Sequence, residues 1–187
     1  MNVKNFWDEG FSFADYLLYN QNIISTLQQS DASGYLHYYE LGMTRMLRLE
    51  RTFKPTEDFL QKLKAKNFKG NLLIISEGWC GDAAMILPIL DKFFGSEQLR
   101  IVLRDSNHLI DHFLTNGGKS IPIVLILDEN FNVINHWGPR PKTGMEMLAK
   151  HKANPQDYTS EDFHNDLQIY YTKNKGVDIL NEILELL

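Results

Sequence analysis

The stretch that decides the fold runs from Gly78 to Pro88 and reads GWCGDAAMILP. It follows the short apolar run Leu72–Ile75, which lies between Gly70 and Gly78 as a buried strand would. Apolar residues then recur at helical spacing, at Met85, Ile86, Ile89, Leu90 and Phe93. The only cysteine, Cys80, is therefore predicted at the junction where a buried strand gives way to a helix.

A cysteine at this position is a candidate nucleophile. The first backbone N–H groups of a helix lack partners within the helix and carry the positive end of its dipole, so they stabilise a thiolate. Cysteines at helix starts have depressed pKa values when solvent and a disulfide can reach the sulfur. We therefore expect an accessible Cys80 thiol with a depressed pKa.

Asp82 stands in the first turn of the same predicted helix. Its negative charge opposes formation of a Cys80 thiolate, so it should limit the depression of the thiol pKa. The simpler interpretation of Asp82 is an acid that stabilises the helix start. The alternative is a catalytic role, as a general base or as a group that binds a substrate amine.

The residues around the cysteine resemble the active-site segment of thioredoxins. The resemblance rests on Trp79–Gly81, on Pro88 eight residues after the cysteine, and on Ile89–Asp91 directly after that proline. A thioredoxin has a second cysteine three residues after the first, with a proline just before it. Asp82 and Ala83 occupy those two places here, so the resolving thiol is missing.

The missing thiol limits the chemistry. A two-cysteine oxidoreductase escapes its mixed disulfide through its second thiol, whereas any disulfide of Cys80 must be intermolecular and resolved by another molecule. Ile74, six residues before Cys80, stands where thioredoxins have a buried acid that assists the second thiol.

A second part of the resemblance is Ile121–Pro122, at the start of a strongly apolar strand. In thioredoxins this proline is cis and faces the active cysteine. The resemblance implies an apolar rim around the sulfur, where an extended partner segment pairs with the backbone. The residues of this rim are Trp79, Gly81, Ile121, Pro122, Trp137 and Gly138. Ordinary packing at strand ends is the alternative for Trp79 and Trp137.

The predicted fold class is α/β, a thioredoxin-like fold with a central mixed four-stranded sheet flanked by helices. Patterning predicts strands at 72–76, 98–104, after Pro122 and at 133–137, and a helix from Ser106 or Asn107 to about 116. The length suits one domain with additions. Its parts are a helical extension (1–70), a thioredoxin-like core (71–150) and a second helical extension (151–187).

Both extensions carry helical patterns. Helices are predicted over 13–27, 35–51 and from Thr56 to about 67, then from Ser160 and over 177–187. The last segment is so apolar that it should dock on the same domain, or else form a dimer contact. The helix over 35–51 has a broad apolar surface that is typical of packing. If it leans over Cys80, its polar residues could contact a small thiol or an anionic group; they are Tyr35, Tyr39, Arg45 and Arg48.

Composition excludes several classes. A net charge of −5 with interspersed signs argues against nucleic-acid binding.

The first residues contain no long apolar segment, so neither a secretory signal nor a membrane span is predicted, and we expect a cytoplasmic protein. His108 and His112 lie four apart, near Asp105 and Asp111, but surface residues are the simpler interpretation. We predict no metal site and no cofactor.

The leading hypothesis is a single-thiol thiol-disulfide oxidoreductase, a monomer or homodimer, that forms mixed disulfides at Cys80 with a protein or a low-molecular-weight thiol. One alternative is a redox-inactive binding module that keeps the partner groove. Another is a peroxide sensor that forms a sulfenic acid at Cys80.

Overall fold

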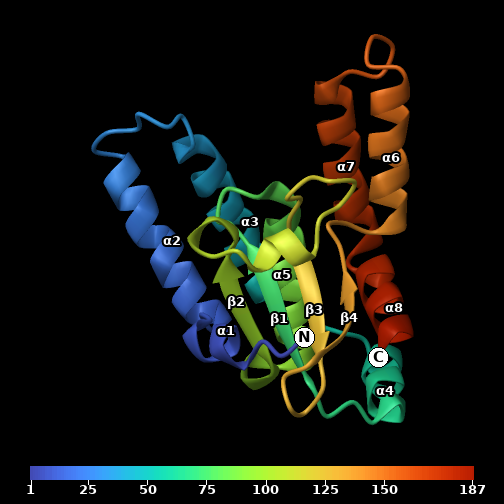
Figure 1. Ribbon diagram of the computed structural model, residues 1–187. Coiled ribbons are helices and arrows are strands. Elements are labelled where there is room, and N and C mark those ends of the chain that lie inside the picture. The colour runs from blue at the N-terminus through green and yellow to red at the C-terminus, as the bar shows by residue number, and fades with distance from the viewer.

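The computed structural model describes residues 1–187 and contains one four-stranded sheet with the order β2-β1-β3-β4 (Figure 1). The strands are β1 (Asn71–Ser76), β2 (Leu99–Leu103), β3 (Ile123–Leu127) and β4 (Val133–Trp137). β1 and β2 are parallel, whereas β3 is antiparallel to both β1 and β4. The predicted mixed four-stranded sheet of a thioredoxin-like fold is confirmed.

Eight α-helices surround this sheet. They are α1 (Lys4–Glu9), α2 (Phe13–Leu27), α3 (Leu36–Thr52), α4 (Glu57–Lys66), α5 (Gly81–Phe94), α6 (Lys142–Ala153), α7 (Ser160–Asn174) and α8 (Val177–Leu186). Three short 3₁₀ turns complete the chain: η1 (Ser96–Gln98), η2 (Arg104–Ser106) and η3 (Leu109–His112). None of these helices combines the length and apolar character that crossing a lipid bilayer requires.

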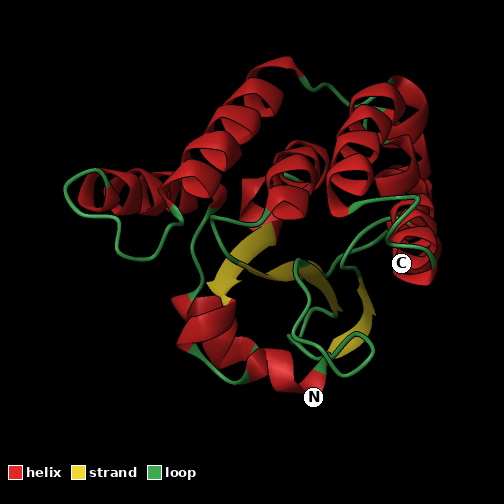
Figure 2. Ribbon diagram, turned by 90° about the horizontal axis from the view of Figure 1, so that it is seen from above, coloured by secondary structure: helices red, strands yellow, loops and turns green.

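The helices form layers on the two faces of the sheet. α5, which follows β1, packs against α3 on one face, and α1 contacts β2 from the other. Figure 2, seen from above, shows most of the helices on one side of the strands and the N-terminal helix on the other. The α2–α3 and α6–α7 pairs rise beyond the upper edge of the sheet on opposite sides (Figure 1).

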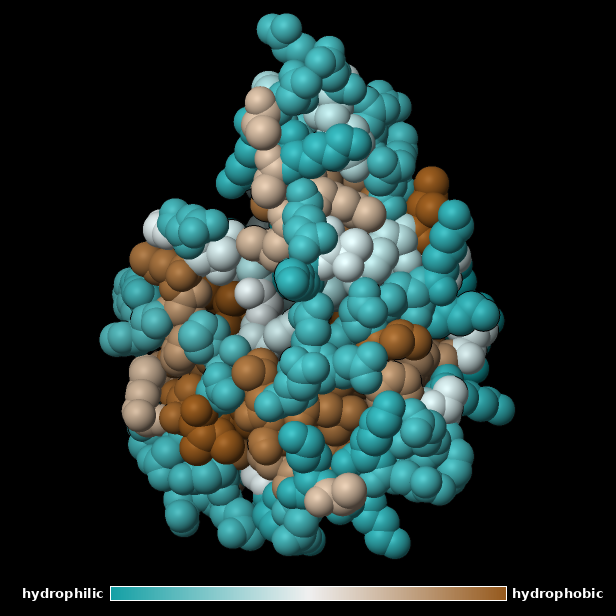
Figure 3. All heavy atoms as spheres, turned by 90° about the vertical axis from the view of Figure 1, so that its right-hand side faces the viewer, coloured by the Kyte–Doolittle hydropathy of each residue, from teal (hydrophilic) through white to brown (hydrophobic).

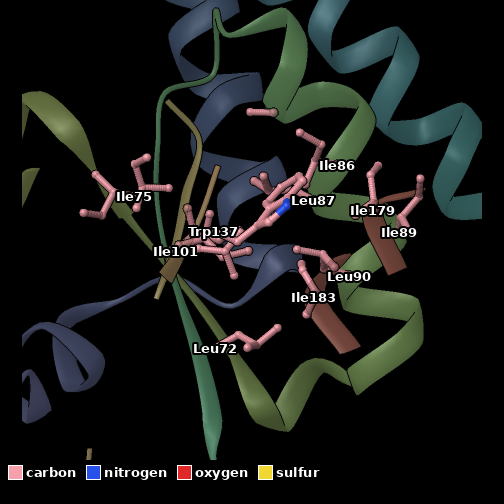
Figure 4. Close-up of a cluster of buried hydrophobic side chains, with 14 of the residues drawn as sticks. Leu72, Ile75, Ile86, Leu87, Ile89, Leu90, Ile101, Trp137, Ile179 and Ile183 are labelled. Carbon is pink, nitrogen blue, oxygen red and sulfur yellow. The ribbon is translucent and has the colours of Figure 1, made fainter. Parts of the chain in front are cut away.

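The core lies between the sheet and α5. Every side chain of β3 is buried, as is every one of β1 except Asn71, because helices cover both faces of these central strands. Figure 4 shows Ile89 and Leu90 of α5 beside Ile179 and Ile183 of α8. The C-terminal tail therefore packs on the same chain, as predicted.

The first residues of the chain also join the sheet. The N–H of Val3 donates to the carbonyl oxygen of Phe131, and Phe11 and Ile101 exchange two backbone hydrogen bonds. A single hydrophobic cluster runs from Val3 to Leu184. The division into a core and two helical extensions stays a prediction.

The side of the molecule that carries α4, α6, α7 and α8 differs in character along its height. Figure 3 shows that the far end of the α6–α7 pair is hydrophilic and that apolar atoms gather lower on this face.

The prediction of a helix from Ser106 or Asn107 to about 116 is wrong. This segment contains only the turns η2 and η3 and a tight turn in which Thr115 pairs with Gly118. The Asn107 side chain donates to Leu103 O and accepts from the N–H of Leu109. Such bonds between side chain and backbone compete with helical ones, so the segment stays irregular.

Candidate functional site around Cys80

The loop between β1 and α5 places the cysteine. Cys80 is the N-cap residue of α5, and its sulfur accepts from the N–H of Ala83 at 3.5 Å. The backbone N–H of Cys80 donates to the carbonyl oxygen of Glu77 at 3.0 Å, which closes the turn before the helix. The prediction that Cys80 stands where a helix begins is confirmed.

The proline loop lies against the sulfur. The thiol of Cys80 donates to the carbonyl oxygen of Ile121 at 3.4 Å, and the Ile121–Pro122 peptide bond is cis. This proximity agrees with the arrangement that the resemblance implies. Both residues are buried, and of the two only Ile121 lines the cavity beside Cys80.

The protonation state of the thiol differs from the expectation. Burial raises the pKa of the Cys80 thiol to about 12, and the charge of Asp82 adds to this rise. The N–H groups of Ala83 and Asp82 and the charge of Arg140 lower the pKa by less. Only 7% of the residue is exposed. The predictions of a depressed pKa and an open sulfur are therefore wrong, because desolvation outweighs the helix start.

Asp82 holds three parts of the chain together. Its Oδ2 accepts from Nη2 of Arg140 at 2.5 Å and from Nε at 3.1 Å, and its Oδ1 accepts from the hydroxyl of Tyr171 at 2.7 Å. The carboxylate thus connects the first turn of α5 to the loop before α6 and to α7. Asp82 is a first-turn helix acid with tertiary partners at both oxygens, and its catalytic role stays a prediction.

A cavity of about 850 Å³ opens beside the cysteine, within the range typical of small-molecule sites. Its floor contains Trp79, Cys80, Gly81 and Asp82, together with Ser120 and Ile121 of the proline loop. One wall comes from the residues before α3 and from α3 itself, and the opposite wall comes from α7. These walls belong to the two helix pairs that rise above the sheet in Figure 1.

The two walls differ in chemistry. The α3 wall presents aromatic and aliphatic side chains, namely Tyr35, Tyr38 and Leu41, together with Arg45. The α7 wall is largely polar, with Glu161, His164, Asn165 and Gln168 beside the apolar Leu167. A ligand in this cavity would therefore meet an aromatic surface on one side and hydrogen-bonding groups on the other.

Trp79 lies between two groups at the edge of the cavity. Its ring centroid is 5.5 Å from that of Tyr35, and the guanidinium carbon of Arg104 lies 4.8 Å from the Trp79 ring centroid. Such cation–π and aromatic contacts fix the orientation of the indole ring.

Other predicted site residues lie elsewhere. Trp137 is buried and donates from Nε1 to Glu182 at 2.7 Å, and neither it nor Gly138 lines the cavity. Gly138 lies so close to the proline loop that a Cβ there would be 2.3 Å from Pro122 O. Trp137 and Gly138 therefore lie outside the cavity lining, and their place on a rim around the sulfur stays a prediction.

Of the four polar residues of the segment 35–51 that the sequence analysis considers as ligand contacts, two line the cavity and two do not. Tyr35 and Arg45 line the cavity, whereas Tyr39 and Arg48 do not. Tyr39 packs behind the cysteine loop, where a Cβ on Gly78 would lie 2.6 Å from its ring. Burial, followed by the charge of Glu77, raises the pKa of Tyr39 to about 12.

Sequence reasoning missed the contribution of the C-terminal half. Arg140 and the polar side chains of α7 line the cavity from positions more than 55 residues after Cys80, and Tyr171 of α7 binds Asp82 at its floor. The run Gly138–Pro141 carries no pattern that points to an ion pair. The one signal in the sequence was Asp82 itself. A carboxylate that becomes buried needs a cation or a hydrogen-bond donor as its partner.

Comparisons with known proteins complete this description. A family model described as Thioredoxin matches residues 29–154. The chain is similar to the crystal structure of an HIV epitope scaffold, with a TM-score of 0.58 and 18% identity over 100% of this chain and 97% of that chain. It is also similar to the crystal structure of a protein of unknown function from Pseudomonas aeruginosa, with a TM-score of 0.49 and 21% identity over 90% of this chain and 96% of that chain. No curated protein matches the sequence.

These similarities carry different weight. At 18% identity, the likeness to the epitope scaffold supports the fold alone. The family match spans most of the chain and includes the cysteine loop, α5, the proline loop and all four strands. The chain therefore belongs to the thioredoxin family.

Proposed function

We propose that this chain binds a small thiol or disulfide, or a protein segment that carries one, in the cavity and forms a mixed disulfide with it at Cys80. The observation that carries this proposal is the position of the sulfur. Cys80 lines a cavity of ligand size, and its thiol contacts the carbonyl oxygen of Ile121 on the proline loop. The only sulfur nucleophile of the chain thus lies where a bound disulfide would meet it.

The exchange needs two steps because the chain has one cysteine. Cys80 loses its proton, and the thiolate attacks one sulfur of the bound disulfide, so a Cys80–S bond forms and the original S–S bond breaks. The other half leaves as a thiolate and takes up a proton. A second thiol from solution then attacks the mixed disulfide, which restores Cys80 and releases a new disulfide.

The raised pKa of the Cys80 thiol limits the rate of thiol-disulfide exchange. A pKa of about 12 leaves roughly one Cys80 in 100,000 as thiolate at pH 7, and the exchange rate follows that fraction. Slow capture of a bound disulfide fits this chemistry better than fast turnover. We therefore expect the lifetime of the bound ligand to matter more than the intrinsic reactivity of the thiol.

The backbone beside the sulfur supports binding of an extended ligand. The N–H of Ile121 makes no hydrogen bond within the chain. A buried N–H needs an acceptor, and a carbonyl oxygen of a bound peptide could supply one. A disulfide within an extended segment would then lie near Cys80.

A redox-inactive binding module is the second candidate. The observation that favours it is the burial of Cys80. Burial raises the pKa of the thiol, so the thiol stays protonated and hydrogen-bonded to the carbonyl oxygen of Ile121. Peroxide sensing has less support, because peroxide oxidises the thiolate and the raised pKa makes this form rare.

The test is intact mass spectrometry after incubation of the chain with excess 2-hydroxyethyl disulfide at pH 7.5. The proposal expects a mass gain of one mercaptoethanol adduct, and no gain in Cys80→Ser. Gln168→Trp should slow the reaction because it fills the cavity from the α7 wall, whereas Ile169→Trp, at an exposed position outside the cavity, should not.

Two results would decide against exchange in the cavity. If a folded chain gained no adduct under these conditions, the binding-module alternative would stand instead. If Gln168→Trp and Ile169→Trp reacted as fast as the parent chain, the adduct would form without use of the cavity.

A further inference from the structure

The cationic side chains around the cavity differ in whether they pair with a carboxylate. Four cationic residues line it, and three of them have a carboxylate partner. Arg104 pairs with Asp105 at 2.7 Å, Lys119 with Asp111 at 2.7 Å, and Arg140 with Asp82 at 2.5 Å. The fourth, Arg45, forms no ion pair. Its side chain makes no hydrogen bond to another residue.

Arg45 lies beside the cysteine. Its Nη1 is 3.6 Å from the place where a Cβ on Gly81 would be, and Gly81 directly follows Cys80. A Cβ there would be in ordinary van der Waals contact with the guanidinium, so the guanidinium lies against the backbone of Gly81 at the floor of the cavity. An anionic group there would be close to both Arg45 and the sulfur.

The environment of Arg45 favours an anion. The side chain is half-buried, and burial, followed by the charge of Arg48, lowers the pKa of its guanidinium, whereas the charge of Asp82 raises it by less. A partly desolvated cation without a partner is unfavourable, and a carboxylate would relieve this because its two oxygens match the planar fork of arginine. Glu161, the acid of the cavity without a cation partner, is exposed on the first turn of the opposite wall.

We infer that Arg45 binds a carboxylate and that the ligand of this cavity is a small thiol or disulfide that carries one. This inference rests on the proposed function and narrows its substrate class. The guanidinium would hold the carboxylate over Gly81, which orients the ligand sulfur toward Cys80. The aromatic groups of the α3 wall, Tyr35 and Tyr38, would cover the ligand from the side.

The experiment uses Cys80→Ser, which cannot form a mixed disulfide, so binding is measured apart from thiol exchange. Two probes of similar size are titrated by NMR: dithiodiglycolate, with two carboxylates, and the uncharged 2-hydroxyethyl disulfide. We expect tighter binding of dithiodiglycolate, with shifts at the Arg45 Nε–H signal. Addition of Arg45→Gln should weaken its binding by about 10- to 100-fold, as loss of a charge-assisted hydrogen bond would.

The controls separate a specific contact from general charge. Arg48→Gln removes a positive charge three residues away on an exposed position, and should leave the preference for dithiodiglycolate unchanged. Arg45→Lys, which keeps the charge but not the planar fork, should retain part of the preference. Equal affinity for the two probes in Cys80→Ser would overturn the inference. Equal loss in the Arg45→Gln and Arg48→Gln variants would also overturn it, whether or not Cys80 reacts with disulfides.

Discussion

The hydroxyl of Tyr171 donates to Oδ1 of Asp82 at 2.7 Å, across 89 positions of the chain. This bond connects α7, which forms one wall of the cavity, to the first turn of the helix that begins at Cys80. Because Oδ2 of Asp82 is held by Arg140, the same carboxylate determines the position of the wall and the electrostatics at the sulfur.

Removal of the Tyr171 hydroxyl should therefore loosen the wall. We expect Tyr171→Phe to lower the free energy of unfolding by about 1–3 kcal/mol, since the bond is buried and its acceptor is charged. Urea denaturation measures this change. Tyr170→Phe is the matched control, because Tyr170 donates to Asp178 at 2.6 Å outside the cavity. A faster reaction of Cys80 with iodoacetamide in the first variant alone would link the wall to the thiol, and equal rates in both would break that link.

The pH dependence of alkylation should report the raised pKa. In the parent chain, the rate of iodoacetamide reaction with Cys80 should keep rising to about pH 11 without a plateau, because the thiol pKa is about 12. Asp82→Asn removes the nearby negative charge, so the pKa should fall by roughly one unit and the rate at pH 9 should rise about tenfold. Asp178→Asn removes a carboxylate elsewhere and should have no effect. A midpoint near pH 8.5 in the parent chain would contradict the buried state of the sulfur.

The same pKa makes a prediction about stability. The folded thiol has a pKa of about 12 against an ordinary value of 9.0, so the folded chain holds this proton more tightly than the unfolded chain. The resulting stabilisation is complete below pH 9 and is lost as the pH rises toward 12. Between pH 9 and 11, the parent chain should lose about 2 kcal/mol more of its unfolding free energy than Cys80→Ser. Parallel pH profiles for the two chains would show that burial does not raise the thiol pKa.

Two glycines allow the N-terminal helices to pack closely against the cysteine loop. A Cβ on Gly78 would lie 1.9 Å from Oδ1 of the buried Asn20, and one on Gly42 would lie 2.8 Å from Gly78 O. Gly78→Ala should therefore destabilise the chain by about 1–3 kcal/mol through overpacking, measured by thermal or urea unfolding. Gly118→Ala, whose Cβ would meet its nearest neighbour at 3.5 Å, should cost much less. Equal effects would mean that the loop yields to accommodate the methyl group.

The C-terminal tail should contribute to stability as part of the core. Ile183 on α8 is fully buried, and Ile183→Ala should lower the free energy of unfolding by about 2–5 kcal/mol. Ile134→Ala, at a side chain that is 55% exposed, should change it by less than about 0.5 kcal/mol. A small effect at Ile183 would indicate that the tail does not dock firmly.

The parts of the fold that the sequence predicts are those with strong local signals. The apolar runs of β1 and β3 and the helix that starts at Cys80 follow from hydrophobic periodicity and flanking glycines. Thr56 caps α4 as expected. The segment from Ser106 to 116 fails because the Asn107 side chain bonds to nearby backbone in place of a helical turn.

Only part of the site around Cys80 can be predicted from the sequence, because local patterns do not show which distant residues meet there. Cys80 and Ile121 could be found because they belong to a motif, but the environment of the sulfur depends on distant residues. Burial reverses the direction of the thiol pKa shift, and no local pattern indicates that Arg140 and Tyr171 bind Asp82. The resemblance to thioredoxins implies a place on the rim for Trp137, yet its indole donates a hydrogen bond to Glu182 of α8.

The most direct test of a reactive sulfur within a ligand cavity is an NMR spectrum of the folded chain that carries Cys80 as its mixed disulfide with mercaptoethanol. The account predicts a spectrum as dispersed as that of the free chain, with shift changes concentrated at the cavity residues Trp79, Arg45, Ile121 and Gln168. Residues of α4 and the far end of β4 should keep their shifts. A collapsed spectrum, or changes spread through the sheet, would show that Cys80 reacts only when the chain opens, and would contradict the proposed site.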